Sequence, residues 1–277
     1  MMLHLCRFIA PVLLLVPLVS MAQGNTVLPG NHPFPGGLVS IKLDGSGDSR
    51  PKAFFGNKPL LVIKENNAWY AVVGIGLKTE PGEHRISAIT TGDQKLDYAF
   101  TVTPKKYPAQ YLKVKQKRYV EPDKNDIKRI LKEKQEITET LSAFSELQPS
   151  TLKMKRPANG RLSSRFGLRR FFNGQERSPH TGLDIAAGNK AVIRAPLDGK
   201  VIRVANYFFS GNIVFIDHGQ GLISTYAHLH RALVREGQNI KTGERVGEVG
   251  ATGRVTGPHL HWSVYLNQEK IDPALLL

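Results

Sequence analysis

The sequence predicts a mainly β protein in which two β-rich parts are joined by a helical connector. Up to about residue 108, short runs of β-branched and aromatic residues alternate with turn signals built from Gly, Pro and Asp. After Pro157 the chain again consists of short apolar runs separated by many glycines. Between the two parts, apolar residues recur at helical spacing. These observations favour two β domains with one helix between them.

The first part, residues 23–108, reads as a small β-sandwich-like domain. Apolar runs at 60–65, 68–77, 85–90 and 96–102 are separated by the turn sequences TEPGEH and TGDQ. Short strands at this spacing are typical of β-sandwiches. We regard this part as a candidate regulatory domain, and we expect its histidines, His32 and His84, to lie on the surface.

Residues 109–153 are expected to form a connector that contains a helix at about 123–147. Asp123 can cap the helix because its carboxylate accepts hydrogen bonds from the free N–H groups of the first turn. Pro149 closes the connector, and a second domain is expected over residues 154–277. The apolar residues that fit helical spacing are Ile127, Ile130, Leu131, Ile137, Leu141, Phe144 and Leu147.

Residues 1–22 have the three-part pattern of a signal peptide. Arg7 precedes an apolar stretch that ends at Val19, and small residues follow up to Ala22. We expect cleavage after Ala22 and export to the periplasm rather than anchoring by an uncleaved signal, because the apolar stretch is short for a membrane span. Cys6, the single cysteine, lies in this segment, so thiol catalysis is excluded for the mature chain.

The chain is strongly basic, with a formal net charge of +15. Removing residues 1–22 takes away one Arg and no acidic residue, which leaves +14. Such a charge concentrates polyanions near the protein. Because export is expected, we predict electrostatic contact with an anionic cell envelope and no binding to nucleic acid.

Two sequence patterns predict a metal site in the C-terminal part. Side chains two or four residues apart on a strand share a face, so His180 and Asp184 can point the same way, and so can His259 and His261. Zinc accepts imidazole and carboxylate ligands at about 2.0 to 2.2 Å, and catalytic sites use three protein ligands with a fourth position for water. The pattern therefore favours a catalytic zinc site that lowers the pKa of a bound water.

A hydrolytic zinc site also needs a proton acceptor. No H-E-x-x-H helix is present to supply a glutamate, so histidines are expected to take this role. Alternation along 224–230 predicts one polar row of Ser224, Tyr226, His228 and His230. Spacing alone does not decide which of His180, His228, His259 and His261 bind the metal.

These motifs resemble the lysostaphin-type family of zinc peptidoglycan endopeptidases. The resemblance runs from about Pro157 to Pro273 and is carried by RLSSRFGLR, HTGLDIAA, APLDGKVIRVA, GNIVFIDHGQGLISTYAHL and the final GPHLHWSVY. It implies that His180, Asp184 and His261 bind one Zn2+ per chain. It also implies that His228 and His259 are paired catalytic histidines, which orient or deprotonate the water and stabilise the oxyanion.

The same resemblance implies the fold and the substrate. The C-terminal part is expected to be an antiparallel β-sheet peptidase domain, barrel-sandwich-like, whose groove receives the wall peptide. Residues 25–150 resemble the amino-terminal domain of some Gram-negative envelope members of the family. This likeness favours stem peptides of peptidoglycan as partners and D-alanyl-diaminopimelate cross-links as the bonds hydrolysed.

Three other functions compete with this interpretation. A catalytically inactive relative could bind the wall or activate an amidase, but all five expected site residues are present. The strings Ala195–Val201 and Gly237–Gly243 are also similar to lipoyl or biotinyl carrier domains, although the carrier lysine motif is missing between them. A general protein protease is not separated from a wall endopeptidase by the metal site alone.

Further polar residues of the C-terminal part lie outside the five expected site positions. We expect His218 and His230 to be turn or rim residues. Arg165 and Arg169 are equally consistent with carboxylate recognition and with structural hydrogen bonds, and Tyr226 fits packing slightly better than catalysis. A latent form, in which a side chain from residues 23–110 occupies the open zinc position, is a hypothesis based on the domain order.

Overall fold

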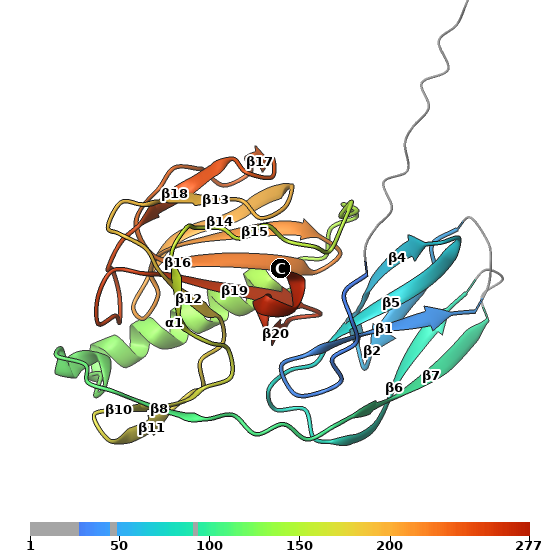
Figure 1. The fold of residues 1–277 in the computed structure, drawn as a ribbon, viewed down its shortest axis with the longest axis horizontal. Coiled ribbons are helices and arrows are strands. Elements are labelled where there is room, and N and C mark those ends of the chain that lie inside the picture. The colour runs from blue at the N-terminus through green and yellow to red at the C-terminus, as the bar shows by residue number, and fades with distance from the viewer. Residues whose placement is uncertain (1–27, 45–48, 91–93) are drawn as a thin grey trace, which may run out of the picture.

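The computed structural model describes residues 28–44, 49–90 and 94–277, and it contains two β domains joined by a connector (Figure 1). The prediction of a mainly β protein with one α-helix is confirmed for the described residues. The expected signal peptide, residues 1–22, lies outside them. Among the described residues, no helix combines the length and the apolarity needed to cross a membrane.

The N-terminal domain is a sandwich of two antiparallel sheets, as its short strands predicted. Its core lies between the sheets and includes Val39, Val62, Trp69 and Ile86, all nearly inaccessible to solvent. One sheet has the order β1 (Leu38–Leu43), β5 (Ala68–Gly74), β4 (Leu61–Glu65), and the other has the order β3 (Lys58–Pro59), β2 (Lys52–Phe55), β6 (Gly82–Ile89), β7 (Lys95–Val102).

The connector contains a strand, β8 (Ala109–Leu112), a short 3-10 helix, η1 (Lys117–Tyr119), and the helix α1 (Lys124–Leu141). Asp123 caps α1 as expected, since its side chain accepts a hydrogen bond from the backbone N–H of Asp126. The helix ends at Leu141 rather than near residue 147, so the predicted end was wrong. Beyond Leu141 the chain runs along the next domain, where the Phe144 ring faces Gly221, the Leu147 backbone faces Gly219, and Ser145 O accepts a hydrogen bond from Gln220 N at 3.0 Å.

The C-terminal domain is built on a ten-stranded sheet with the central order β17-β14-β15-β16-β19-β12-β9. A small sheet, β11-β10-β8, lies beside it and pairs the connector strand β8 in parallel with β10. The elements are β9 (Arg161–Ser164), β10 (Arg169–Phe172), β11 (Gln175–Arg177), β12 (Leu183–Ala186), β13 (Val192–Arg194), β14 (Gly199–Tyr207), β15 (Gly211–Gly219), β16 (Leu222–Ala232), β17 (Asn239–Ile240), β18 (Arg245–Val249), β19 (Leu260–Leu266), β20 (Glu269–Ile271) and the 3-10 helix η2 (Pro273–Leu276).

The two faces of the large sheet are used differently. One face carries Tyr226, Trp262 and other side chains of the main core. The opposite face carries Ile223 and Tyr265, which pack under Ile137 and Leu141 of α1. The part of this second face that α1 leaves open carries the candidate site described below.

The two domains share buried contacts. Leu38 and Leu61 of the N-terminal domain belong to the same core cluster as Trp262. Asn267 accepts a hydrogen bond from Gly74 N at 2.7 Å and donates one to Gly74 O at 3.1 Å, and both bonds are buried. This contact satisfies one backbone donor and one backbone acceptor at the interface.

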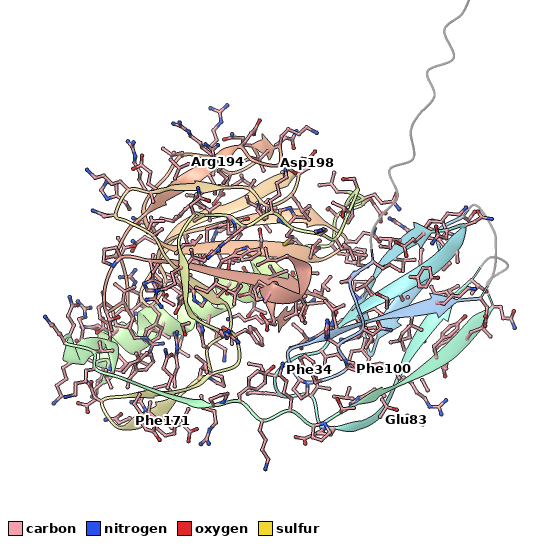
Figure 2. All side chains as sticks on the ribbon, viewed as in Figure 1. Phe34, Glu83, Phe100, Phe171, Arg194 and Asp198 are labelled. Atoms are coloured by element: carbon pink, nitrogen blue, oxygen red, sulfur yellow. The ribbon has the colours of Figure 1, made fainter. Side chains whose placement is uncertain are left out.

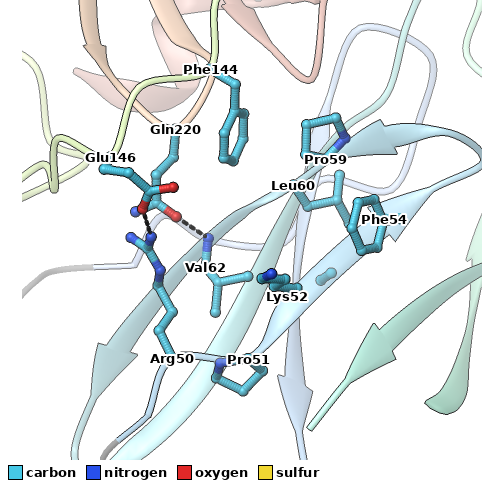
Figure 3. A pocket seen from close by; sticks show the side chains of 11 residues that line it. Arg50, Pro51, Lys52, Phe54, Pro59, Leu60, Val62, Phe144, Glu146 and Gln220 are labelled. Carbon is cyan, nitrogen blue, oxygen red and sulfur yellow. Dashed lines mark hydrogen bonds and ion pairs between the residues drawn. The ribbon is translucent and has the colours of Figure 1, made fainter. Parts of the chain in front are cut away.

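A pocket of about 310 Å³ opens at this interface (Figure 3). Gln220 reaches across it and accepts a hydrogen bond from Val62 N at 3.0 Å. Arg50 of the N-terminal domain pairs with Glu146 of the segment that follows α1. These two contacts therefore link the N-terminal and C-terminal parts of the chain around the pocket.

A chain of polar side chains is buried inside the C-terminal domain. His218 Nδ1 donates to Asp198 O at 2.8 Å, its Nε2 lies 2.7 Å from Ser224 Oγ, and that hydroxyl lies 2.6 Å from the Tyr226 hydroxyl. His218 was expected in a turn or at a rim, and this was wrong because β15 continues to Gly219 and carries His218 into the core. Tyr226 is packed in the core and has no exposed surface.

We predict that His218 contributes to the loss of stability at low pH. Burial lowers the pKa of His218 to about 4, from an ordinary value of 6.5. Between these two values the unfolded chain binds a proton at His218 and the folded chain does not, so the free energy of unfolding falls as the pH falls from 6.5 to 4. The decrease in the free energy of unfolding that is due to His218 approaches about 3 kcal/mol.

Urea titrations of the metal-free protein at pH 7 and pH 4 measure this effect. We expect His218→Gln to be less stable than the wild type at pH 7 but to lose less stability on acidification. The exposed His230, changed to Gln, is the matched control and should follow the wild type. An equal pH dependence in wild type and His218→Gln would contradict the prediction.

Candidate metal centre and groove

Three neighbouring strands carry the candidate site on the open face of the large sheet. In the antiparallel register, Asp184 of β12 lies opposite His261 of β19, and His261 lies opposite Ala227 of β16. Cross-strand partners share a face, so Asp184 and His261 point the same way. Ala227 lies in the next strand, β16, and its small side chain lines a hollow above the sheet.

His180 reaches the site from the loop between β11 and β12. Its backbone N–H donates to Leu168 O at 2.8 Å, and its carbonyl accepts from Gly167 N at 2.7 Å. Gly182 then brings the chain against β19, where an added Cβ would lie 2.5 Å from Trp262 O and 2.8 Å from the His261 ring. A side chain at position 182 would therefore push β12 away from His261.

The structure brings His180, Asp184 and His261 together, although they are far apart in sequence. His180 Nε2 lies 2.9 Å from Asp184 Oδ1 and 3.0 Å from His261 Nδ1, and His261 Nδ1 lies 2.8 Å from the same carboxylate oxygen. His180 and Asp184 are buried, and His261 is partly buried. Three possible ligand atoms therefore converge on one point at the floor of the groove.

The hydrogen bonds around this trio fit a bound cation. His180 Nδ1 lies 2.6 Å from Arg165 O, which can only accept, so this nitrogen carries the proton and the neutral ring presents Nε2 as a lone pair. His261 Nε2 lies 3.0 Å from Ser263 Oγ, which leaves Nδ1 to face Asp184. Two imidazole lone pairs and a carboxylate oxygen are a donor set that zinc accepts, with a fourth position left open.

A second layer of polar groups holds the carboxylate of Asp184. Arg170 Nη2 donates to Asp184 Oδ2 at 2.7 Å and to Ser164 Oγ at 3.2 Å. Gln110 of the connector accepts from Arg170 Nε at 3.2 Å and from Ser164 Oγ at 3.3 Å. Burial raises the pKa of Asp184, but its contacts with the two imidazoles lower it more, so the carboxyl is ionised.

His228 and His259 lie beside this trio with their rings oriented by backbone carbonyls. His228 Nδ1 donates to Thr252 O and His259 Nδ1 donates to Gly257 O, both at 2.9 Å. The remaining nitrogen of each ring, Nε2, is then the one that can face a substrate, and His259 Nε2 lies 3.7 Å from Asp184 Oδ1. The ring centroids of His228 and His259 are 4.9 Å apart, and those of His228 and His261 are 6.0 Å apart.

The direction of the His228 side chain differs from the sequence expectation. Regular alternation from Tyr226 would turn His228 into the core. His228 instead faces the groove, so the predicted polar row of Ser224, Tyr226, His228 and His230 is wrong. His228 has a φ of +64°, in the left-handed region that non-glycine residues rarely adopt, and the strand register shifts close by. This irregularity turns His228 toward His259, and such strain is typical of functional sites.

Burial is the main cause that lowers the pKa of His228 to about 3, and the neighbouring rings of His261 and His259 contribute to this shift in the same direction. His228 is therefore neutral at pH 7. A neutral imidazole with a free Nε2 can accept a proton, so the site contains a base.

Two hollows of about 290 and 220 Å³ form a groove over the site, and Arg170, His228 and Arg254 line both. The connector adds Gln110, Leu112 and Val114 to one wall. Neither hollow is lined by residues 28–44, 49–90 or 94–108. Among the described residues of 23–110, Gln110 lines one of the two hollows, but its side chain is bonded to Arg170 and Ser164 and not to His180, Asp184 or His261. The latent arrangement is therefore not seen in the described part of the chain.

Other sequence candidates lie away from the groove. Arg169 is paired with Glu176 through hydrogen bonds of 3.1 and 2.8 Å, and the side chain of Arg165 is exposed while its backbone carbonyl orients His180. Sequence reasoning chose Arg165 and Arg169 and missed Arg170. Alternation on β10 was the available signal, because it puts residues 170 and 172 on the groove side and residues 169 and 171 on the other.

Comparisons with known proteins agree with this geometry. Residues 178–273 match the family model of Peptidase family M23, and residues 31–105 match that of the Peptidase family M23 N-terminal domain. The crystal structure of a putative peptidase M23 from Pseudomonas aeruginosa is 40% identical to this chain, covers 89% of this chain and 95% of its own, and superposes with a TM-score of 0.76.

Two curated relatives match the C-terminal domain. The peptidoglycan DD-endopeptidase ShyA of Vibrio cholerae is 38% identical over 113 residues, which are 40% of this chain and 26% of the relative. The DD-carboxypeptidase/endopeptidase Mpg of Neisseria meningitidis is 40% identical over 114 residues, which are 41% of this chain and 26% of the relative. The matched segment thus spans about a quarter of the length of each of these relatives.

We predict that Arg170→Met weakens zinc binding by about 10- to 100-fold, because Asp184 loses the group that orients its carboxylate. Competition between the metal-free protein and a coloured chelator measures the affinity. Arg169→Met is the matched control, since Arg169 pairs with Glu176 and not with Asp184. Unchanged zinc binding by Arg170→Met would contradict the prediction, and tighter binding would show that Arg170 mainly repels the metal.

Proposed function

This chain belongs to peptidase family M23, and we propose that it is a zinc-dependent endopeptidase that hydrolyses the peptide cross-links of bacterial peptidoglycan. The observation that carries the proposal is the convergence of His180, Asp184 and His261 beside two further histidines at the floor of a groove. The names of the curated relatives support peptidoglycan as the substrate. We further propose D-alanyl-diaminopimelate bonds as the site of cleavage.

In this proposal, His180 Nε2, Asp184 Oδ1 and His261 Nδ1 would hold a zinc ion. Bound zinc would act as a Lewis acid that lowers the pKa of a water and polarises the scissile carbonyl. Arg165 O and Ser263 Oγ set the ring orientations of the two histidine ligands, and Arg170 sets the orientation of the carboxylate. Such outer contacts tune both affinity and geometry.

His228 and His259 are proposed to manage the protons and the developing charge. Each ring donates from Nδ1 to a backbone carbonyl and keeps Nε2 free. One of the two rings accepts the proton of the attacking water at Nε2 and then gives it to the leaving amine. While that ring is protonated, its positive charge stabilises the negative charge that develops on the oxygen of the scissile carbonyl. No side chain forms a covalent bond with the substrate.

The setting of the reaction is also a proposal. The N-terminal pattern of residues 1–22 supports export to the periplasm. The strongly basic chain supports an electrostatic attraction to the anionic envelope. Both features would bring the groove to cross-linked wall.

Digestion of purified diaminopimelate-type peptidoglycan, with fragments identified by mass, tests the proposal. We expect the wild type to convert cross-linked dimers to monomers with zinc and not after chelation. His180→Ala should lose both bound zinc and activity. His228→Ala should keep its zinc and lose about 100- to 10,000-fold in activity, because it removes a proton carrier.

The matched control is His230→Ala, which alters an exposed histidine on the same strand and should retain full activity. Parallel digestion of casein separates a wall endopeptidase from a general protease. Absence of cleavage by zinc-loaded wild type would contradict the proposed function. Loss of zinc from His228→Ala would instead contradict the division between ligands and proton carriers.

A further inference from the structure

Arg254 lies where the two hollows of the groove meet. It belongs to the loop between β18 and β19, and it lines both hollows together with His228. Its backbone N–H donates to Phe209 O at 2.9 Å, which ties this loop to the chain that precedes β15. The loop also provides Thr252 and Gly257, whose carbonyls orient His228 and His259. Arg254 is thus placed by the same loop that places the proton carriers.

The guanidinium of Arg254 is held between two aromatic rings. It lies 4.6 Å from the centroid of Phe172 and 4.4 Å from that of Phe209. Phe172 lines one hollow and Phe209 lines the other. Contacts with ring faces restrain a planar guanidinium and leave its N–H groups, which lie in its plane, free to bind a partner.

The other arginines near the groove already have acceptors. Arg170 is bound to Asp184, and Arg177 donates to the backbone carbonyl of Val120 at 3.0 Å. By contrast, no side-chain hydrogen bond or ion pair of Arg254 is found in the part of the chain that the structure describes. Arg254 is therefore a cation of the groove whose donors are unused.

An unused cation in a partly buried position costs free energy unless a partner arrives. Burial lowers the pKa of Arg254 to about 10, and the nearby Arg170 and Arg177 act in the same direction. Arg254 nevertheless remains charged at neutral pH. The groove therefore presents a positive charge beside the proton carriers even after Asp184 has been neutralised by its own partners.

We infer that Arg254 binds a carboxylate of the substrate peptide next to the scissile bond and makes the enzyme selective for substrates with a free carboxylate over amidated ones. The planar fork of a guanidinium matches a carboxylate with two parallel hydrogen bonds. This inference rests on the proposed function. It assigns Arg254 to specificity, because the carboxylate that Arg254 binds is adjacent to the scissile bond but takes no part in its cleavage.

A cross-linked stem peptide offers two sources of such a carboxylate: the carboxylate borne by the diamino acid at the cross-link, and a carboxylate at the end of a peptide chain. Three synthetic cross-linked dimers separate them, one with both groups free, one amidated at the diamino acid, and one amidated at the chain end. Zinc-loaded wild type, Arg254→Met, Arg254→Lys and the control Arg169→Met are compared by kcat/KM on each dimer.

Arg169→Met is a matched control because Arg169 also lies near a phenylalanine ring, at 5.5 Å from Phe171, but it is paired with Glu176. Phe171 and Arg169 lie on the side of β10 that faces away from the groove, and Figure 2 shows Phe171 at the edge of the molecule. This variant removes an arginine from the small sheet that also carries Phe172, without changing the groove.

We expect amidation at one of the two positions to lower kcat/KM of the wild type about 10- to 100-fold, as for loss of a charge-assisted pair. The kcat/KM of Arg254→Met should be equal on the unmodified dimer and on the dimer whose amidation slows the wild type. On that amidated dimer the variant should have the same kcat/KM as the wild type, which would also show that the variant folds. Arg254→Lys should retain part of the discrimination, and Arg169→Met all of it. The position at which amidation matters identifies the source of the carboxylate.

Two results would overturn the inference while leaving the proposed function intact. One is a wild type that cuts all three dimers equally well. The other is an Arg254→Met variant that loses the same factor on every dimer, which would assign Arg254 to the structure of the loop. Failure of the wild type to cut any dimer would contradict the proposed function itself.

Discussion

The antiparallel pairing of β12, β19 and β16 is the constraint on which the rest of the site depends. This register sets Asp184, His261 and Ala227 in one row across the sheet. Because strand side chains alternate, the same register sends Trp262 and Tyr226 into the core on the other face. A shift of one residue would exchange the two sets, placing the polar groups in the core and the aromatic residues in the groove. Core packing and the position of the metal centre are therefore set together.

The connector completes both ends of the open face. Its helix α1 covers Ile223 and Tyr265, so that part of the face is apolar and closed. Its strand β8 pairs with β10 and brings Gln110 to Arg170, which holds Asp184. Part of the support for the metal centre thus comes from residues that precede the segment matched to the peptidase family, residues 178–273. A fragment limited to that segment would lack this wall of the groove.

Charges in the groove fall into two groups. His228 is kept neutral by burial, while Arg170 neutralises the carboxylate that would hold the metal. Arg254 differs, because it is restrained by aromatic rings and has neither a side-chain hydrogen bond nor an anionic partner among the described residues, whereas Lys270 of the same groove donates to Thr181. A site that combines the neutral base His228 with such a cation is suited to a substrate that is neutral at the bond attacked and anionic nearby.

The sequence by itself determined the mainly β class, the sandwich of the N-terminal domain and the cap of α1 at Asp123, because these depend on local alternation and on capping chemistry. It also identified the five histidine and aspartate side chains that the structure brings together, through their spacing and their resemblance to a family. Only the tertiary structure decided the direction of His228, whose positive φ breaks the alternation that sequence reasoning assumes. The surroundings of Arg170 and Arg254 and the early end of α1 were also decided there, because each depends on a contact with a distant segment that no local pattern encodes.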